Sequence, residues 1–311
     1  MTLAHYAETN GQILTSQPFQ VINARFYTFA FKGSISKELC DRWFTNPSGG
    51  SVEASSFLPL VIISFCDYTE GCSIPQRYKG KIDYHETLFT TFVRLKNGGS
   101  SVVYAFAPYL FLNNASAIAA GREIYGMPKT WGWIKIPAAA NPDYFSAETE
   151  AFFSYSPDNH EKTDVLVEIK LLSDSFREDA PVIEDDMEKI WTDLQEDYNK
   201  SFPDERAEAD LCRQLRDFFS HRRFPFVSLK QFPDIEDGSK ACYQSIVGFS
   251  MKIDKIKIKR LKGPYVLTLT SCDQFPIGKD LGLSSGQKTL FSRLIEWNFV
   301  FEAGKELWKA P

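Results

Sequence analysis

The sequence predicts a mainly β fold of the α+β class, in which antiparallel strands form a barrel-like sheet. Most segments before residue 175 alternate apolar and polar residues, as strands with two different faces do. These strands follow one another without intervening helices, which favours antiparallel pairing, and closure of the sheet removes its exposed edges. Near Pro181 the spacing of apolar residues changes to that of helices, which predicts an inserted helical region.

The first half of the chain supplies the predicted strands. They are expected at residues 21–31, 60–65, 82–95, 101–112, 131–136, 144–155 and 165–172. Within the first strand, Arg25 shares a face with Tyr27, whereas Phe26 lies on the other face. An Asn-Gly-Gly turn at 97–99 joins two strands and predicts a β-hairpin.

The second half combines helices with further strands. Apolar residues at helical spacing predict a helical insertion at about 181–222, which is too short to build a core of its own. We therefore expect one domain over residues 1–311. Strands return at residues 224–229, 241–258 and 265–270. A stripe formed by Leu290, Leu294, Ile295 and Phe299 after Ser284 and Ser285, two candidate N-caps, predicts a C-terminal helix.

Charge and composition exclude several classes of function. The net charge is -5, and the lysines between residues 252 and 262 alternate with isoleucines, as on the wet face of a strand, so no nucleic-acid partner is expected. Residues 1–20 lack a secretory apolar region, and no apolar run reaches the roughly 18 residues of a membrane span. We expect a cytoplasmic protein that does not enter a membrane.

Cysteine and histidine spacing argues against a bound metal. The six cysteines form no C-x-x-C pair, and the four histidines have no ligand spacing such as H-x-x-x-H. Free thiols, no metal and no cofactor are the expectation. Cys66 follows an apolar run, which predicts a buried and inert thiol.

The segment from Gly121 to Lys129 carries the chemistry. Gly121 and Gly126 permit unusual backbone conformations, and Pro128 fixes the approach to Lys129. An ordinary lysine has a pKa of about 10.4, so at neutral pH very little of it is the amine that can attack a carbonyl. Burial disfavours the ammonium form and makes a lysine a nucleophile. Local sequence alone also fits a surface lysine after a turn.

Three motifs extend this hypothesis. The stretch Gly121-Arg-Glu-Ile-Tyr-Gly-Met-Pro-Lys129 resembles the signature of the acetoacetate decarboxylase family, in which G-R-E is followed by variable residues and then P-K. Tyr84-His-Glu86 resembles the Y-x-E of that family, and Asn23-Ala-Arg25-Phe-Tyr27 resembles the segment with its active-site arginine. The resemblance extends over most of the chain, apart from the helical insertion.

The resemblance implies an acetoacetate decarboxylase-like fold and a catalytic set of Lys129, Glu86 and Arg25. Lys129 would form an imine with a small β-keto acid, and carbon dioxide would leave. Glu86 would orient groups or shuttle protons. Arg25 would hold the substrate carboxylate or pair with Glu86, although Arg25 and Glu86 could also form a purely structural ion pair. Tyr84 and Met127 are expected to contact the substrate, and family members are often homo-oligomers.

One departure leaves alternatives open. Many members of this family have a second lysine directly after the first, where this chain has Thr130. A neighbouring cation is therefore absent at that position, and burial must keep Lys129 neutral. The same imine also supports aldol addition or dehydration, so an aldolase or dehydratase is the nearest alternative. A non-catalytic protein that binds small molecules is the alternative from another class.

Overall fold

Strands dominate the computed structural model, which describes residues 17–138, 142–172, 182–203 and 209–310. The strands before the insertion are β1 (Phe19–Lys32), β2 (Val52–Ser56), β3 (Leu60–Ser73), β4 (Ile82–Asn97), β5 (Ser100–Leu112), β6 (Lys129–Trp131), β7 (Trp133–Lys135), β8 (Tyr144–Ala151) and β9 (Lys162–Leu171). The later strands are β10 (Ile183–Glu184), β11 (Arg223–Pro233), β12 (Ala241–Arg260), β13 (Tyr265–Leu269), β14 (Phe291–Phe301) and β15 (Lys305–Lys309). The predicted mainly β fold is confirmed.

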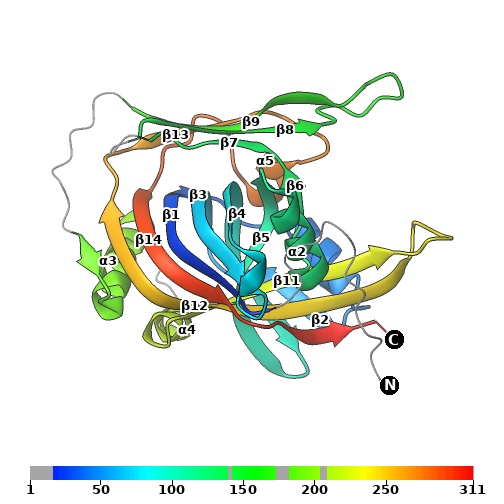
Figure 1. Cartoon of the computed structure of the whole chain (residues 1–311), viewed down its shortest axis with the longest axis horizontal. Coiled ribbons are helices and arrows are strands. Elements are labelled where there is room, and N and C mark those ends of the chain that lie inside the picture. The colour runs from blue at the N-terminus through cyan, green and yellow to red at the C-terminus, as the bar shows by residue number, and fades with distance from the viewer. Residues whose placement is uncertain (1–16, 139–141, 173–181, 204–208, 311) are drawn as a thin grey trace.

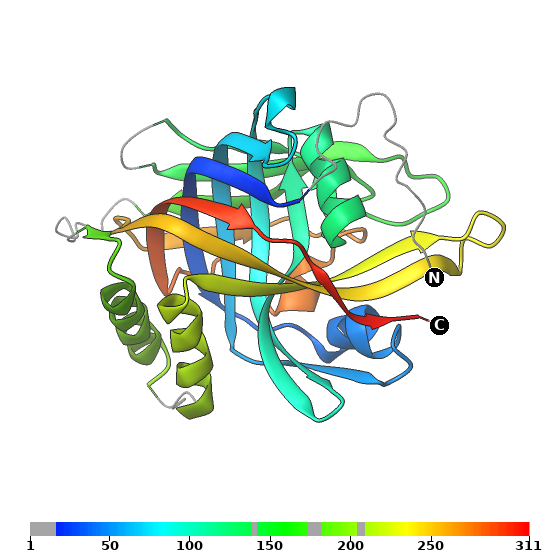
Figure 2. The same ribbon diagram turned by 60° about the horizontal axis from the view of Figure 1, so that its bottom comes forward.

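The helices are short and few by comparison. They are α1 (Lys37–Cys40), the π-helical turn η1 (Asp41–Thr45), the 3₁₀ turn η2 (Arg77–Lys79), α2 (Ala115–Tyr125), α3 (Met187–Ser201), α4 (Ala209–Ser220) and α5 (Ile277–Leu281). The predicted helical insertion contains α3 and α4, which lie beside each other against the barrel (Figure 2). Its predicted first residue, Pro181, lies outside the described residues. Within the described ranges, none of these helices has the length and apolar character needed to cross a membrane.

Seven strands close into a barrel. Their order is β4-β3-β1-β14-β12-β11-β5, and β5 pairs back with β4. Neighbours in this ring are antiparallel except for β11 and β5, which are parallel. The predicted hairpin is the β4–β5 pair, in which Asn97 pairs with Ser100 across Gly98 and Gly99. Both glycines have positive φ, which that tight turn requires.

A second sheet covers one side of the barrel. Its order is β13-β9-β8-β7, and it lies across the ends of the barrel strands in Figure 1. Phe29 and Phe65 of the barrel meet Phe145 and Tyr265 of this sheet, and all four rings are fully buried. Because side chains alternate along β1, Phe26 on the other face points away from this core. That alternation gives the barrel an interior face separate from the main core.

The predicted C-terminal helix is wrong. Residues 291–301 form β14, hydrogen-bonded between β1 and β12. Leu290 and Leu294, and likewise Ile295 and Phe299, are four residues apart, as neighbours on a helix are. The segment also alternates in steps of two and is rich in aromatic residues, which favour strands. Pairing on both sides decides the outcome, because without β14 the ring would stay open. Ser285 caps no helix; its hydroxyl donates to the carbonyl of Leu269.

Candidate active site

The backbone around Lys129 is held by the helix that precedes it. Asn114 caps α2 by accepting a hydrogen bond from the backbone N–H of Ala117. Gly126 ends α2 with a φ of +69°, a left-handed conformation that glycine adopts readily. Arg122 donates a hydrogen bond to the carbonyl of Lys129 at 3.3 Å. The turn between α2 and β6 is therefore fixed, and Lys129 extends into the barrel.

Gly121 leaves room for the Lys129 side chain. A Cβ atom added to Gly121 would lie 2.5 Å from Cδ and 2.7 Å from Cε of Lys129. These distances are far below a normal van der Waals contact, so α2 can pass the lysine only where it carries no side chain. Gly121 of the signature thus leaves the space that the side chain of Lys129, eight residues later, occupies.

Lys129 forms a buried ion pair with Glu86. Its Nζ lies 2.8 Å from Oε2 of Glu86, and only 6% of Lys129 and 2% of Glu86 are exposed. The other carboxylate oxygen, Oε1, accepts a hydrogen bond from the Tyr68 hydroxyl at 3.3 Å. Removing two charges from water is costly unless they are paired, so this pair needs both partners. The structure thus brings together two of the three residues in the expected catalytic set, Lys129 and Glu86.

Two tyrosines form the wall beside the ion pair. Tyr68 and Tyr84 stack with ring centroids 4.5 Å apart, and Nζ of Lys129 lies 5.5 Å from the centroid of Tyr84. Burial, and next the negative charge of Glu86, raise the pKa of both hydroxyls well above the ordinary value. Both therefore stay protonated, and Tyr68 serves as a hydrogen-bond donor.

No thiol competes with the amine as nucleophile beside the pair. Cys66 lies opposite Glu86 across the β3–β4 ladder and is fully buried. Burial raises the pKa of its thiol well above the ordinary value, so the reactive thiolate is suppressed. The predicted buried and inert Cys66 is confirmed. It is also a free thiol, as are the other cysteines that the structure describes: Cys40, Cys72, Cys242 and Cys272.

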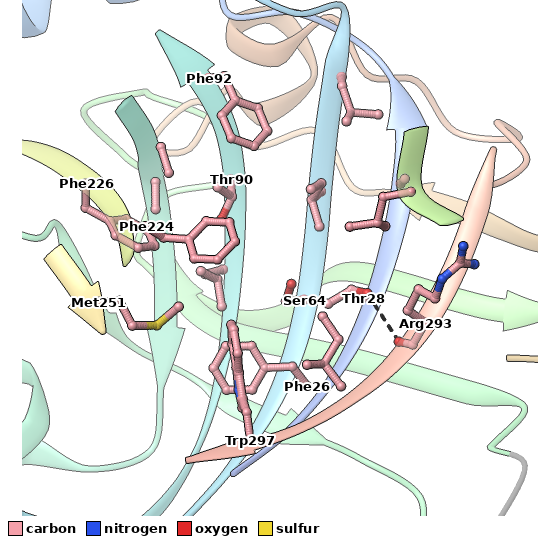
Figure 3. A pocket seen from close by; sticks show the side chains of 18 of the residues that line it. Phe26, Thr28, Ser64, Thr90, Phe92, Phe224, Phe226, Met251, Arg293 and Trp297 are labelled. Carbon is pink, nitrogen blue, oxygen red and sulfur yellow. Dashed lines mark hydrogen bonds between the residues drawn. The ribbon is translucent and has the colours of Figure 1, made fainter. Parts of the chain in front are cut away.

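The ion pair lies on the wall of a cavity of about 260 Å³ inside the barrel. Aromatic and aliphatic side chains from β1, β3, β4, β11, β12 and β14 form most of its wall, and α3 and α4 close one side. Figure 3 shows Phe26, Phe224, Met251 and Trp297 around the open space. A substrate in this cavity would lie against a mostly apolar wall.

Arg25 lies elsewhere. Its side chain is 50% exposed and forms an ion pair with Asp67 on the outside of the barrel. Arg25 lies on the face of β1 opposite to Phe26, and its side chain does not line the cavity. The expected pairing of Arg25 with Glu86 is wrong, and the structure does not bring Arg25 to Lys129. His85 also faces Asp67, at 3.5 Å, on the opposite face of β4 from Glu86.

The two residues expected to contact the substrate lie close to the lysine. Met127 lines the cavity together with Lys129, and Tyr84 lines a small recess behind the lysine with Gly121. Thr130 lines a separate hollow on the other side of β6. A side chain at position 130 thus points away from the amine in this chain.

A second charged cluster on the cavity wall was missed by sequence reasoning. Arg293 is 2% exposed and pairs with Asp193, at 2.7 Å, and with Asp197, both on α3. Arg260 pairs with the same two carboxylates. The cluster ties α3 to β12 and β14. Tyr68 was missed as well; its approach to Glu86 depends on the β3–β4 register, which no local pattern supplies.

No metal-binding cluster accompanies these residues. Across the described ranges, no group of three or more His, Cys, Asp or Glu side chains is placed to hold a metal ion. Beside the lysine, the cavity wall brings together an amine, a carboxylate and a phenol, namely Lys129, Glu86 and Tyr68. Such a set can form an imine and move protons within it.

Comparisons with known proteins agree with this geometry. Residues 52–151 match the sequence model of the family described as acetoacetate decarboxylase, and this segment contains both Glu86 and Lys129 but not Arg25. No curated protein sequence matches the chain.

Solved structures share the fold at low identity. The acetoacetate decarboxylase of Legionella pneumophila subsp. pneumophila str. Philadelphia 1 is 16% identical with a TM-score of 0.59, covering 99% of this chain and 93% of that one. An acetoacetate decarboxylase-like enzyme from Sphingomonas wittichii RW1 is 10% identical with a TM-score of 0.54, covering 99% and 100%. The enduracididine biosynthesis enzyme MppR, complexed with pyruvate, is 14% identical with a TM-score of 0.53, covering 96% and 93%. Residues 52–151 thus resemble the acetoacetate decarboxylase family, and the chain shares the fold of these acetoacetate decarboxylase-like structures.

Proposed function

We propose that the protein is a lyase that decarboxylates a β-keto acid through an imine on Lys129. The observation that supports this most strongly is the buried contact of 2.8 Å between Lys129 Nζ and Glu86 Oε2 at the wall of an apolar cavity. A fold alone does not fix a function, so the proposal stands on these side chains. The match of residues 52–151 to the acetoacetate decarboxylase family makes decarboxylation the first reaction to test.

The reaction follows from an amine and a carboxylate in contact. Glu86 accepts a proton from Lys129, and the neutral amine attacks the ketone carbon. The ketone oxygen leaves as water, which gives a protonated imine. The bond to the carboxylate then breaks; its electron pair moves toward the iminium nitrogen, and carbon dioxide leaves. The resulting enamine takes up a proton at carbon, and water hydrolyses the imine to release the ketone and the free lysine.

Glu86 acts as the proton carrier in this scheme. It is in hydrogen-bond contact with the amine, and its second oxygen is held by Tyr68. A general acid or base must lie within hydrogen-bond reach of the proton that it moves, which Glu86 does. The apolar wall disfavours the charged carboxylate of the substrate but not neutral carbon dioxide. It therefore favours decarboxylation.

Two alternatives share parts of this site. An aldolase or dehydratase would use the same imine; MppR, which has the same fold, was solved with the condensation product of pyruvate and imidazole 4-carboxaldehyde. A carrier of small molecules would use only the cavity. A buried ion pair stabilises a fold poorly compared with apolar residues, so a carrier gains little from Lys129 and Glu86.

The test is turnover in water labelled with oxygen-18. The wild type and Lys129→Met are incubated with β-keto acids, and carbon dioxide and the ketone product are measured by mass spectrometry. Hydrolysis of an imine puts the oxygen of water into the ketone, so the wild type should release carbon dioxide together with labelled ketone. Lys129→Met should do neither above the spontaneous rate.

The other outcomes separate the alternatives. Carbon–carbon bond formation between a keto acid and an aldehyde, without gas release, would identify the aldolase. Saturable binding without any product would identify the carrier. Equal gas release by the wild type and Lys129→Met would exclude the lysine as catalyst.

A further inference from the structure

The cavity is elongated along the barrel strands. Glu86, Leu88, Thr90 and Phe92 all line it from one face of β4. Strands rise about 3.3 Å per residue, so this row extends over about 20 Å. The neighbouring strands continue it, since Ala30 on β1 pairs with Ile62 on β3, which pairs with Thr90. Lys129 stands at one end of this row, beside Glu86.

The far end is built from different elements. Leu58, Leu60 and Phe202 pack there with Ala30 in one apolar cluster, and Tyr198 of α3 and Leu215 of α4 contact it. The near end is another cluster, in which Phe26 and Tyr84 pack with Ala107 and Met127. The two ends are thus separate, and the helical insertion supplies part of the far wall.

Charge is almost absent between the two ends. Among the residues that line the cavity, the charged ones are Glu86, Lys129 and Arg293. Arg293 is already paired with Asp193 and Asp197. A buried apolar cavity of about 150 Å³ accommodates a ligand the size of benzene. At about 260 Å³, this cavity would be only partly filled by a four-carbon keto acid, which is close to benzene in size.

We infer that the substrate is a β-keto acid with a long apolar chain, which extends from Lys129 along β4 to the walls of α3 and α4. That the substrate is a β-keto acid rests on the proposed function, whereas the binding of its apolar chain rests on the cavity alone. Leu194 and Leu215 face the chain from the insertion and limit its length. The insertion thereby becomes the element that sets substrate size.

The test measures binding without chemistry. β-Hydroxy acids have no ketone and cannot form an imine, so a series from 3-hydroxybutyrate to 3-hydroxydodecanoate reports on the cavity alone. Each added methylene should lower Kd about two- to fourfold, the upper figure corresponding to about 0.8 kcal/mol per buried methylene. The improvement should stop where the chain reaches the far wall. Calorimetric titration gives Kd for each acid.

A matched pair of substitutions locates the chain. Ala30 and Ala107 line the far and the near half of the cavity, and each can be changed to leucine. Ala30→Leu should weaken only the long acids and stop the improvement at a shorter chain. Ala107→Leu should weaken all acids alike. Leu215→Ala, which removes bulk from the far wall, should move the limit to a longer chain and keeps the test decisive if Ala30→Leu does not fold.

The outcomes separate this inference from the proposed function. A Kd that is independent of chain length, or a length limit that neither far-end variant moves, would overturn the inference. If long β-hydroxy acids bind as described but no β-keto acid is turned over, the inference stands and the proposed function fails. If β-keto acids of every length are turned over with equal kcat/KM, the proposed function stands and the inference fails.

Discussion

Two buried ion clusters border the same cavity, and they differ in what their cations can do. In one, the amine of Lys129 meets a single carboxylate, that of Glu86. In the other, the guanidinium of Arg293 meets the carboxylates of Asp193 and Asp197, which Arg260 also holds. Arginine stays charged at any ordinary pH, whereas a lysine can give up its proton and act as a nucleophile.

The partners differ as well. Both aspartates of the Arg293 cluster lie four residues apart on α3, so the cluster fixes one helix against two strands. Among the described residues, the Glu86 side chain binds Lys129 and the Tyr68 hydroxyl, and the three side chains come from three separate strands. Burial of a charged side chain is therefore not enough to indicate a catalytic role. A proton that can move, at the wall of a cavity, distinguishes the first cluster from the second.

Replacing Lys129 with a cation that cannot lose its proton should have the largest effect, and that effect should be on activity. Lys129→Arg keeps a positive charge next to Glu86 but removes the amine, because a guanidinium cannot form the imine. We expect kcat/KM for the best β-keto acid to fall at least about a thousandfold, as when other covalent nucleophiles are removed. Steady-state assays measure it. Retention of more than a tenth of the activity would contradict the proposed role.

Loss of one carboxylate from the structural cluster should affect stability. Asp197→Asn leaves buried guanidinium charge uncompensated, and breaking such a pair costs about 3 kcal/mol. Thermal unfolding followed by circular dichroism should show a Tm about 5 °C lower. Asp164→Asn is the control, because Asp164 pairs with Lys162 at the surface and the substitution should leave Tm nearly unchanged. Equal effects of the two substitutions would refute the structural role of the Arg293 cluster.

A methyl group beside the lysine should displace it without unfolding the protein. The Cβ of Gly121→Ala would lie 2.5 Å from Cδ of Lys129, so the side chain must move. A displacement of about 1 Å can cost about a hundredfold in rate, and we expect kcat to fall by about that factor. Gly238→Ala serves as the control, because its added Cβ would meet no atom within 4 Å. Unchanged kcat in Gly121→Ala would show that Lys129 tolerates other positions.

The exposed cluster at Arg25 should show the smallest effect. The hydrogen bond with Asp67 raises the pKa of His85 above its ordinary value. The charged imidazole therefore stabilises the folded state fully below the unfolded pKa of about 6.5, and this contribution disappears as pH rises through the raised folded pKa. Since His85 is partly exposed, the contribution should stay below about 1 kcal/mol.

Urea unfolding at several pH values measures this effect. The difference in unfolding free energy between the wild type and His85→Gln should be largest at pH values below the unfolded pKa and vanish in alkali. A difference that grows as pH rises would have the wrong sign and would refute the assignment to the His85–Asp67 contact.

Sequence reasoning predicted the mainly β fold, and it singled out Lys129 and Glu86, which the structure brings into contact. Period-two alternation identified the barrel strands, and the motifs Gly121–Lys129 and Tyr84-His-Glu86 drew attention to these two residues. These signals are local, or they lie within one continuous matched segment. Arg25 was assigned to the site by resemblance and by its place on one face of the first strand. Alternation separates the two faces of that strand but does not tell which one lines the cavity; in the structure it is the face with Phe26.

Long-range pairing set the limit of prediction. Residues 291–301 fit both a helix and a strand by spacing, and only hydrogen bonds to β1 and β12 decide between them. Once that segment was taken for a helix, Arg293 could not be placed on the cavity wall. Tyr68 likewise reaches Glu86 through a strand register that no short motif encodes.

Trapping the imine is the most direct test of the proposed role of Lys129. The protein is incubated with a β-keto acid and sodium borohydride, digested, and mapped by mass spectrometry; borohydride reduces an imine to a stable secondary amine on the lysine that formed it. We predict that the reduced adduct appears on the peptide that contains Lys129 and is absent when borohydride or the keto acid is omitted. An adduct spread over surface lysines, with Lys129 unmodified, would contradict the proposed role of Lys129.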